Sequence, residues 1–315
     1  MSEEERGAIV VRLDAKGCLV RLDEPIEGLP ADGHELWCGV RGRIHLRDRR
    51  SQKSPVAVGD RVTVIHTQED RGAVVSVHPR RSTLSRPSKR HGKVEHVMAA
   101  NVDQVVIVSA LDDPPFNPAL VDRMLAVVEF SKLEAVIVVN KMDLGEEPPA
   151  ELAFYEAMGY RTVFTSAVDG RGLDTLREHL TGKTSVVAGH SGVGKSSLLN
   201  AVQSGLGLAV GLVNKVTGRG RHTTTAAVWI PLVDGGAVID TAGVREFGLF
   251  GIPARDLPWL FRDIAALAPE CRYPDCSHTH EPECMVQEAL LEGDLAPFRF
   301  DSYLKILESF EEQDG

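Results

Sequence analysis

Short runs of Val, Ile and Leu, separated by turn residues, fill the first eighty residues of the chain. They lie at residues 7–13, 17–22, 35–46, 60–66 and 72–78. Short apolar runs bounded by turn signals are typical of strands in a small all-β domain. We therefore expect a closed barrel over residues 1–80, of the OB-fold type, with an SH3-like barrel as the alternative.

A different pattern begins near residue 99, where apolar runs alternate with helical patterns. The runs lie at residues 102–110, 135–139, 161–165, 184–188 and 237–239, and residues 119–130 and 152–159 have helical periodicity. Strands that alternate with helices predict a parallel sheet covered on both faces. We assign residues 99–250 to this α/β domain and residues 251–315 to a mostly helical domain that contains a Cys/His cluster.

A basic segment joins the barrel to the α/β domain. Residues 80–93 carry six Lys and Arg, no acidic residue and no apolar periodicity. This composition is typical of a solvated connection, so we predict a linker over residues 81–98.

Composition narrows the class of protein. The chain has 315 residues, of which 43% are hydrophobic and 25% charged, as in ordinary globular domains. No apolar run approaches the roughly 18 residues of a membrane span, and the acidic start has no signal-peptide pattern. The five cysteines do not suggest a disulfide framework. We expect a cytoplasmic monomer with no membrane partner.

Charge is distributed unevenly along the chain. The net charge is −10, yet residues 1–100 hold 18 Lys and Arg against 14 Asp and Glu. Residues 281–315 hold two basic and ten acidic side chains. A basic N-terminal third is a weak indication of an anionic partner at that end.

The sequence GHSGVGKS at residues 189–196 matches the phosphate-binding P-loop pattern, between an apolar run and a helical pattern. In such a loop, backbone N–H groups surround phosphate and the helix N-terminus adds positive potential. Lys195 would reach the β- and γ-phosphates, and Ser196 would bind Mg²⁺. The predicted phosphate contacts are Gly189, His190, Ser191, Gly192, Val193, Gly194, Lys195, Ser196 and Ser197.

A second motif selects the base. Asn140, Lys141 and Asp143 form the pattern N-K-x-D directly after an apolar run. The Asp143 carboxylate can accept hydrogen bonds from N1–H and the 2-amino group of guanine, and adenine lacks both donors. Ser166 and Ala167 follow another strand, and the Ala167 N–H would make a second guanine contact. The chain should therefore bind GTP and GDP rather than ATP.

A third group of residues surrounds the γ-phosphate. Asp240 and Gly243 form a D-x-x-G pattern after the run at residues 237–239. The carboxylate can hold Mg²⁺ through water, and the Gly243 N–H can meet the γ-phosphate. The glycine-rich residues 205–225 are a candidate switch loop, with Thr224 as the expected Mg²⁺ ligand. Neighbouring threonines at 223 and 225 are alternatives.

The order of these motifs is unusual, because N-K-x-D and S-A precede the P-loop. Joining the ends of a GTPase domain and cutting it elsewhere produces this circularly permuted order. With GHSGVGKSSLLN, GRGRHTTT and the Cys/His spacing, the chain resembles the bacterial small-ribosomal-subunit-dependent GTPases of the RsgA/YjeQ type. His190 and Ala242 depart from that family, where we would expect Gln and often Pro.

The resemblance implies the fold and the function over nearly the whole chain. The implied fold is an OB-fold barrel, a circularly permuted P-loop GTPase domain and a helical zinc-binding domain. The implied activity is hydrolysis of GTP to GDP and phosphate, stimulated by the 30S subunit and its 16S rRNA, late in maturation of that subunit. A GTP-gated RNA-binding switch with incidental hydrolysis is the alternative, and an ATP-dependent P-loop kinase is a second one that the guanine motif opposes.

The chain lacks the glutamine that orients the attacking water in many GTPases. Many GTPases carry a water-orienting Gln after D-x-x-G, but this chain has Val244. His222 is the nearest replacement in sequence, and the resemblance points to it as well. Arg219 and Arg221 are rivals as charge stabilisers, and His222 could instead contact only RNA or solvent. We take Lys195, His222 and Thr224 as the catalytic set.

Four residues near residue 280 have metal-ligand chemistry. Cys271, Cys276, His278 and Cys284 supply three thiolates and one imidazole, a set suited to one structural Zn²⁺. The spacing departs from common zinc fingers, and the resemblance implies the same ligand set. His280 is an alternative ligand, and a cluster of reduced thiols is the alternative to a metal. Two other cysteines, at 18 and 38, should be core residues.

An arginine-rich run in the barrel is the candidate RNA contact. Its members are Arg41, Arg43, Arg47, Arg49 and Arg50. Such a face can bind phosphates, although a solvated strand edge would have the same composition. The run contains no aromatic residue, which argues against base stacking and favours recognition of folded rRNA by shape.

Overall fold

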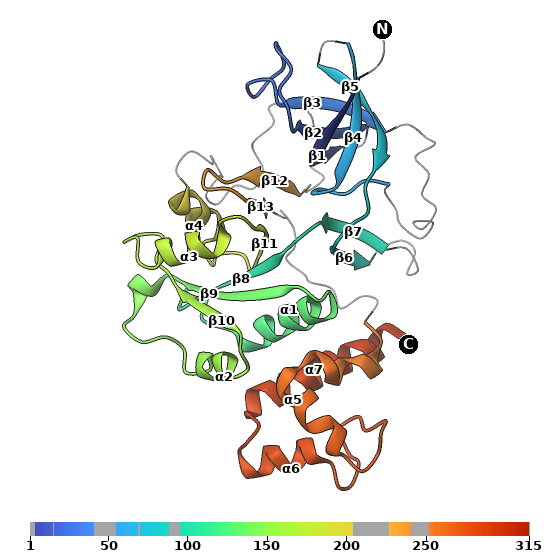
Figure 1. Ribbon diagram of the computed structural model, residues 1–315. Helices are drawn as coiled ribbons and strands as arrows, with labels where there is room; N and C mark the ends of the chain where they lie inside the picture. The colour runs from blue at the N-terminus through green and yellow to red at the C-terminus, as the bar shows by residue number, and fades with distance from the viewer. Residues whose placement is uncertain are drawn as a thin grey trace.

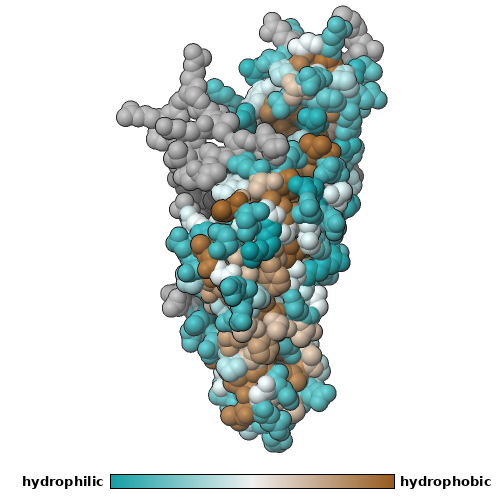
Figure 2. Space-filling model, turned by 90° about the vertical axis from the view of Figure 1, so that its left-hand side faces the viewer, coloured by the Kyte–Doolittle hydropathy of each residue, from teal (hydrophilic) through white to brown (hydrophobic). Residues whose placement is uncertain are grey.

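The computed structural model describes residues 4–14, 16–40, 55–68, 70–87, 95–203, 227–240 and 252–314. Three regions follow one another along the long axis of the molecule (Figure 1). A β-barrel lies at one end, an α/β domain occupies the middle, and C-terminal helices form the other end. No helix among these residues is long and apolar enough to cross a membrane. On the face drawn in Figure 2, hydrophilic residues interrupt the hydrophobic ones along the whole length.

The N-terminal region is a five-stranded barrel. Its strands are β1 (Glu5–Asp14), β2 (Gly17–Leu22), β3 (Glu35–Val40), β4 (Arg61–Gln68) and β5 (Arg71–Val77). They pair in the order β1-β2-β3-β5-β4, and β4 pairs again with β1 to close the barrel. Alternate residues point inward, as in β2, where Cys18, Val20 and Leu22 are buried. The parallel pairing of β3 with β5 gives the Greek-key order of an OB-fold, which confirms the predicted barrel.

The segment predicted as a linker contains paired strands at its ends. β6 (Thr83–Pro87) and β7 (Glu95–Ala100) form an antiparallel pair between the barrel and the α/β domain (Figure 1). Leu84 and Ala99 are fully buried in the main hydrophobic core. In β6, Leu84 is a single aliphatic residue among polar and basic ones and gives no periodic signal, so only the tertiary contact reveals this strand.

The α/β domain is built on six strands. They are β8 (Gln104–Ala110), β9 (Glu134–Asn140), β10 (Arg161–Phe164), β11 (Thr184–Ala188), β12 (Val228–Pro231) and β13 (Ala237–Asp240). Their order is β10-β9-β8-β11-β13-β12, and every pairing is parallel except that of β12 with β13. The parallel sheet is as predicted, but the sequence pattern did not predict strand β12. β12 also pairs with β1 through Val228 and Arg12, so barrel and domain share one continuous sheet.

Helices cover both faces of this sheet. They are α1 (Pro118–Phe130), η1 (Met142–Leu144), α2 (Leu152–Ala157), α3 (Leu173–Leu180) and α4 (Lys195–Val202). Val105 and Ile107 of β8 face one core with α1 and α2, and Val106 and Val108 face the other with α3 and α4. Strands buried on both faces read as continuous apolar runs, which is the pattern of the sequence here.

The C-terminal region packs against α1. Its elements are η2 (Ala254–Leu260), α5 (Arg262–Leu267), η3 (Ala268–Glu270), α6 (Met285–Glu292) and α7 (Pro297–Asp314). Phe261, Ile264 and Tyr303 belong to the same hydrophobic cluster as Leu125 of α1. The helical region therefore shares a core with the α/β domain and is not an independent appendage.

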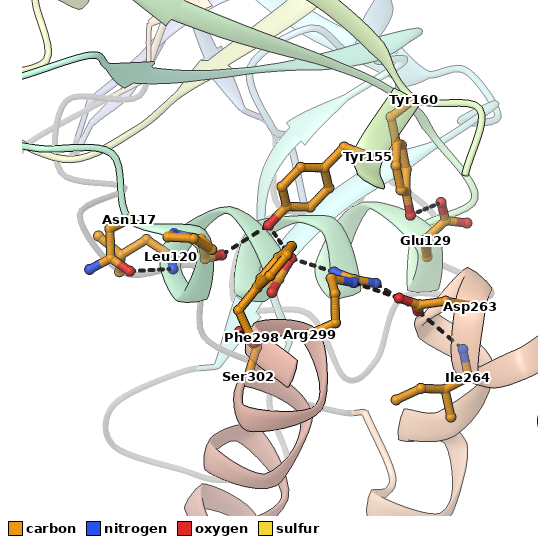
Figure 3. A network of polar contacts seen from close by, with 12 residues as sticks. Asn117, Leu120, Glu129, Tyr155, Tyr160, Asp263, Ile264, Phe298, Arg299 and Ser302 are labelled. Carbon is orange, nitrogen blue, oxygen red and sulfur yellow. Dashed lines mark hydrogen bonds and ion pairs between the residues drawn. The ribbon is translucent and has the colours of Figure 1, made fainter. Parts of the chain in front are cut away.

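A buried polar network fixes this contact (Figure 3). Arg299 of α7 donates to Asp122 of α1 and, at 2.8 and 3.0 Å, to Asp263 of α5. The Tyr155 hydroxyl donates to Asp122 at 2.6 Å. Arg299 and Asp122 are each 1% exposed. Burial raises the pKa of Asp122, and the Arg299 charge counteracts that rise.

Candidate nucleotide and metal sites

Asn140 connects the predicted nucleotide-binding segments. It ends β9 and is 1% exposed. Its Nδ2 donates to the Val193 carbonyl of the P-loop at 2.9 Å, and its Oδ1 accepts from Thr165 at 3.3 Å. One side chain therefore holds the P-loop beside the segment that carries Ser166. Thr165 is fully buried and was not predicted, because a lone Thr at a strand end gives no sequence signal.

The backbone conformation of the P-loop explains why two of its positions require glycine. Gly189 has φ 149°, and a Cβ there would lie 2.1 Å from the Val108 carbonyl oxygen. Gly194 has φ 89°, and a Cβ there would lie 2.5 Å from Asn140 Nδ2. Both positions combine a left-handed backbone with close packing, which only glycine accepts. The loop and the start of α4 are therefore shaped by these two residues.

Lys195 lies inside the loop that precedes it. It begins α4, and its Nζ donates to the carbonyls of Gly189 at 2.8 Å and His190 at 2.7 Å. This geometry holds the ammonium group over the loop, where a phosphate chain would bind. The His190 ring Nδ1 lies 2.9 Å from the Ser191 carbonyl oxygen.

The guanine motif and the S-A segment meet directly. The Ser166 hydroxyl donates to Asp143 Oδ1 at 2.6 Å, and Ser166 also accepts from the N–H groups of Val168 and Asp169 at 3.2 Å. Lys141 has a left-handed backbone with φ 62°, and its Nζ donates to the Asp113 carbonyl. The Ser166 hydroxyl therefore orients the Asp143 carboxylate.

Asp240 ends β13 beside the P-loop strand. Its backbone pairs with Val187 of β11. Burial raises the pKa of Asp240, and the positive charge of Lys195 opposes this rise. An acidic oxygen and the P-loop lysine thus share one region of the site, as cation and phosphate binding requires.

Several predicted residues lie outside the described part of the chain. They are Thr224, His222, Gly243 and the arginine-rich run Arg41, Arg43, Arg47, Arg49 and Arg50. The described residues therefore include the guanine motif, the phosphate loop and Asp240, and the binding roles of all these residues, of the switch loop and of the arginine run remain predictions.

The predicted metal ligands form a compact cluster. The ligand atoms of Cys271, Cys276, His278 and Cys284 all lie within 4.8 Å of one another. His278 Nδ1 is 3.6 Å from the Cys271 sulfur and 3.5 Å from the Cys284 sulfur, and those two sulfurs are 4.0 Å apart. The cluster can hold a metal ion.

Burial favours the neutral forms of two free ligands, the His278 imidazole and the Cys276 thiol. Burial lowers the pKa of His278, which favours the neutral imidazole that coordinates metals. Burial raises the pKa of the Cys276 thiol to about 12, so a cation is needed to stabilise its thiolate. Tyr303 of α7 donates to the Ser277 carbonyl at 2.9 Å and so anchors the ligand loop to the helical core.

These features define a P-loop GTPase domain in which the guanine motif precedes the P-loop. A family model described as RsgA GTPase matches residues 77–250. The chain is 43% identical to the small ribosomal subunit biogenesis GTPase RsgA of Chlorobaculum parvum, over 82% of this chain and 86% of that protein. The chain therefore belongs to the RsgA GTPase family.

Solved structures agree with this assignment. The crystal structure of YjeQ from Thermotoga maritima is 32% identical, with a TM-score of 0.73, and covers 97% of this chain and 98% of its own. YloQ, described as a circularly permuted GTPase, is 26% identical, with a TM-score of 0.71 and coverage of 98% and 96%. The predicted resemblance and permuted GTPase fold are confirmed, and the protein is a GTPase.

Proposed function

We propose that this GTPase hydrolyses GTP to GDP and phosphate on the small ribosomal subunit, and acts late in the maturation of that subunit. The observation that carries the proposal is the position of Asn140, which joins the P-loop to the segment beside Asp143. The residues proposed to bind the base and the phosphates thus belong to one hydrogen-bonded unit. The ribosomal partner is supported by the names of relatives such as RsgA of C. parvum.

The nucleotide would lie across this unit. Asp143, oriented by Ser166, would accept two hydrogen bonds from guanine, and the Ala167 N–H would donate to the base. Lys195 would exchange one of its carbonyl contacts for the β- and γ-phosphates. Such an exchange gives the ammonium an anionic acceptor in place of a neutral carbonyl, so that both partners of the hydrogen bond carry charge.

Mg²⁺ and Zn²⁺ are the proposed metal ions. Ser196 and Thr224 would be the direct Mg²⁺ ligands, with Asp240 acting through water, and the ion would neutralise phosphate charge. The Cys/His cluster would hold one structural Zn²⁺. A tetrahedral site with Zn–S bonds of about 2.3 Å has ligand–ligand distances of about 3.8 Å. The three distances among Cys271, His278 and Cys284 are 3.5, 3.6 and 4.0 Å, and all four ligand atoms lie within 4.8 Å of one another.

The hydrolytic step would depend on the ribosome. Val244 cannot orient water, so we assign this role to His222 and expect slow turnover in the free protein. Closure of residues 205–225 on the subunit would bring Thr224 and His222 to the phosphates. The arginine-rich run would contact phosphates of 16S rRNA.

Steady-state GTP turnover with and without purified 30S subunits tests the proposal. We expect strong stimulation by 30S, none by 50S, and competition by GDP but not by ATP. Equal turnover with and without 30S would support the alternative of a GTP-gated RNA switch. Competition by ATP would contradict the guanine assignment.

A further inference from the structure

The outer surface of the barrel carries an aromatic cleft that the GTPase site does not use. Four neighbouring strands align one residue each, because Arg12 of β1 pairs with Leu19, Leu19 pairs with Trp37, and Trp37 pairs with Arg71. A partly exposed indole and a leucine therefore lie between two arginines. Arg12 lies over the indole, 6.0 Å from its ring centre.

The partly exposed indole also lines an open cleft on this surface. A cleft of about 490 Å³ is lined by Leu19, Trp37 and Arg71, among other residues. Gly39 follows Trp37 on the same face of β3, and the position of its absent Cβ is open space. Glycine at residue 39 adds no side chain on the face that carries the ring. The volume is within the range of small-ligand sites.

The location matches a known use of this architecture. OB-folds bind oligonucleotides on the β2–β3 face, between the β1–β2 and β4–β5 loops. The cleft is lined by Trp37 of β3, by Lys16 of the β1–β2 loop and by Asp70 of the β4–β5 loop. A planar ring between cations suits a nucleobase that stacks on indole while its phosphates meet arginine or lysine.

The acidic residues of the cleft limit what can bind there. Asp14, Glu35 and Asp70 also line it. Asp14 accepts from the Lys16 N–H at 3.0 Å, and Asp70 lies 3.5 Å from Arg71. These carboxylates would repel a phosphate backbone that ran directly over the cleft. A single base turned out of its strand would avoid this repulsion, because its phosphates would lie beside Arg12 and Arg71 on either side of the indole.

We propose that Trp37 is a stacking platform for one unpaired base of single-stranded RNA. The proposal rests on the proposed function for its choice of an RNA partner, and it adds a base-reading site to it. The arginine-rich run contains no aromatic residue, so composition had argued against stacking in that run. Trp37 lies before the run, and only the strand pairing shows its accessible ring and flanking arginines.

Intrinsic fluorescence can test the platform, because the chain has only three tryptophans. Trp37 lies in the barrel, Trp229 in β12 and Trp259 in η2. In the variant Trp229→Phe/Trp259→Phe, Trp37 is the only reporter. We expect a 12-nucleotide oligo(rA) to quench its emission, and an rA·rU duplex, whose bases are already stacked, to quench it far less.

Affinity measurements in the wild-type background complete the test. Trp37→Ala should weaken oligo(rA) binding about 5- to 150-fold, the range for loss of one base–aromatic stack. Trp37→Phe should retain most of the affinity, and the control Trp259→Ala, which removes an exposed tryptophan elsewhere, should change nothing. Thermal melting of each variant shows whether the barrel is folded. Arg71→Gln should weaken binding with the ring intact.

Three results would overturn the platform. They are absence of quenching by oligo(rA), equal affinities of Trp37→Ala and Trp37→Phe, and quenching by an arginine-rich peptide in place of RNA. The titrations contain neither ribosomes nor GTP, so they are independent of 30S-stimulated turnover. Failure of the platform would leave the proposed GTPase function intact, and loss of stimulation would leave the platform intact.

Discussion

Removal of Arg299 should destabilise the contact between the C-terminal helices and the α/β domain. Arg299→Met keeps most of the apolar side-chain volume and removes the charge that Asp122 faces. Asp122 and Arg299 are each 1% exposed, so no solvent can replace the lost cation. Breaking a buried ion pair by removing one partner costs about 3–5 kcal/mol, a large part of the roughly 5–15 kcal/mol that stabilises a domain.

The loss of stability in Arg299→Met should increase as the pH rises. The pKa of Asp122 is already raised by burial, and loss of Arg299 raises it further. A carboxyl group whose folded pKa is raised binds its proton more tightly when folded, so stability is lost as pH rises from the unfolded pKa to the folded pKa. The deficit of Arg299→Met should therefore be larger at pH 8 than at pH 5, by about 1.4 kcal/mol per unit of additional pKa shift.

Urea unfolding followed by Trp259 emission, in a protein with Trp37→Phe and Trp229→Phe, measures this deficit. Arg161→Met is the control, because its partner Glu134 lies at 3.2 Å and both side chains are more than half exposed. That exposed pair should contribute about 0–1 kcal/mol. The double variant Asp122→Asn/Arg299→Met should recover part of the loss, since the fully buried charge is gone and the Asp263 carboxylate, which also loses its arginine, is 18% exposed. A deficit below about 1 kcal/mol at pH 8, or no recovery in the double variant, would refute the reasoning.

Three further predictions concern the nucleotide and metal sites. Asp143→Asn should weaken GTP binding by about 1.5–3 kcal/mol and improve binding of XTP, whose 2-carbonyl accepts from the amide; equal GTP affinity by calorimetry would contradict the guanine assignment. Cys276→Ser should lose bound zinc by metal analysis and lower the protection of residues 271–284 against hydrogen exchange, while GTP binding persists; a folded variant with a full equivalent of zinc would remove Cys276 from the ligand set. His222→Ala should reduce 30S-stimulated turnover about 10²–10⁴-fold with GTP and 30S binding near normal; full turnover would leave His222 as a contact residue only.

The sequence by itself determined the chemistry of the nucleotide site. The P-loop, N-K-x-D, S-A and D-x-x-G patterns are local, and each follows an apolar run that predicts a strand. Strands β9, β11 and β13 end at these motifs as predicted, because continuous apolar runs are what a doubly covered parallel sheet requires. The barrel was predicted from short apolar runs bounded by turn residues, and in the structure alternate residues of these strands point inward.

Tertiary structure alone decided which distant residues meet. Asn140 bonds to Val193, 53 positions away, and Arg299 bonds to Asp122, 177 positions away. Neither contact has a local sequence signature, because a buried Arg and an exposed Arg look alike in a helical pattern. The row that surrounds Trp37 likewise depends on the pairing of four strands. Periodicity specifies which face of an element is apolar, whereas the partner across that face is chosen by the packing of the whole chain.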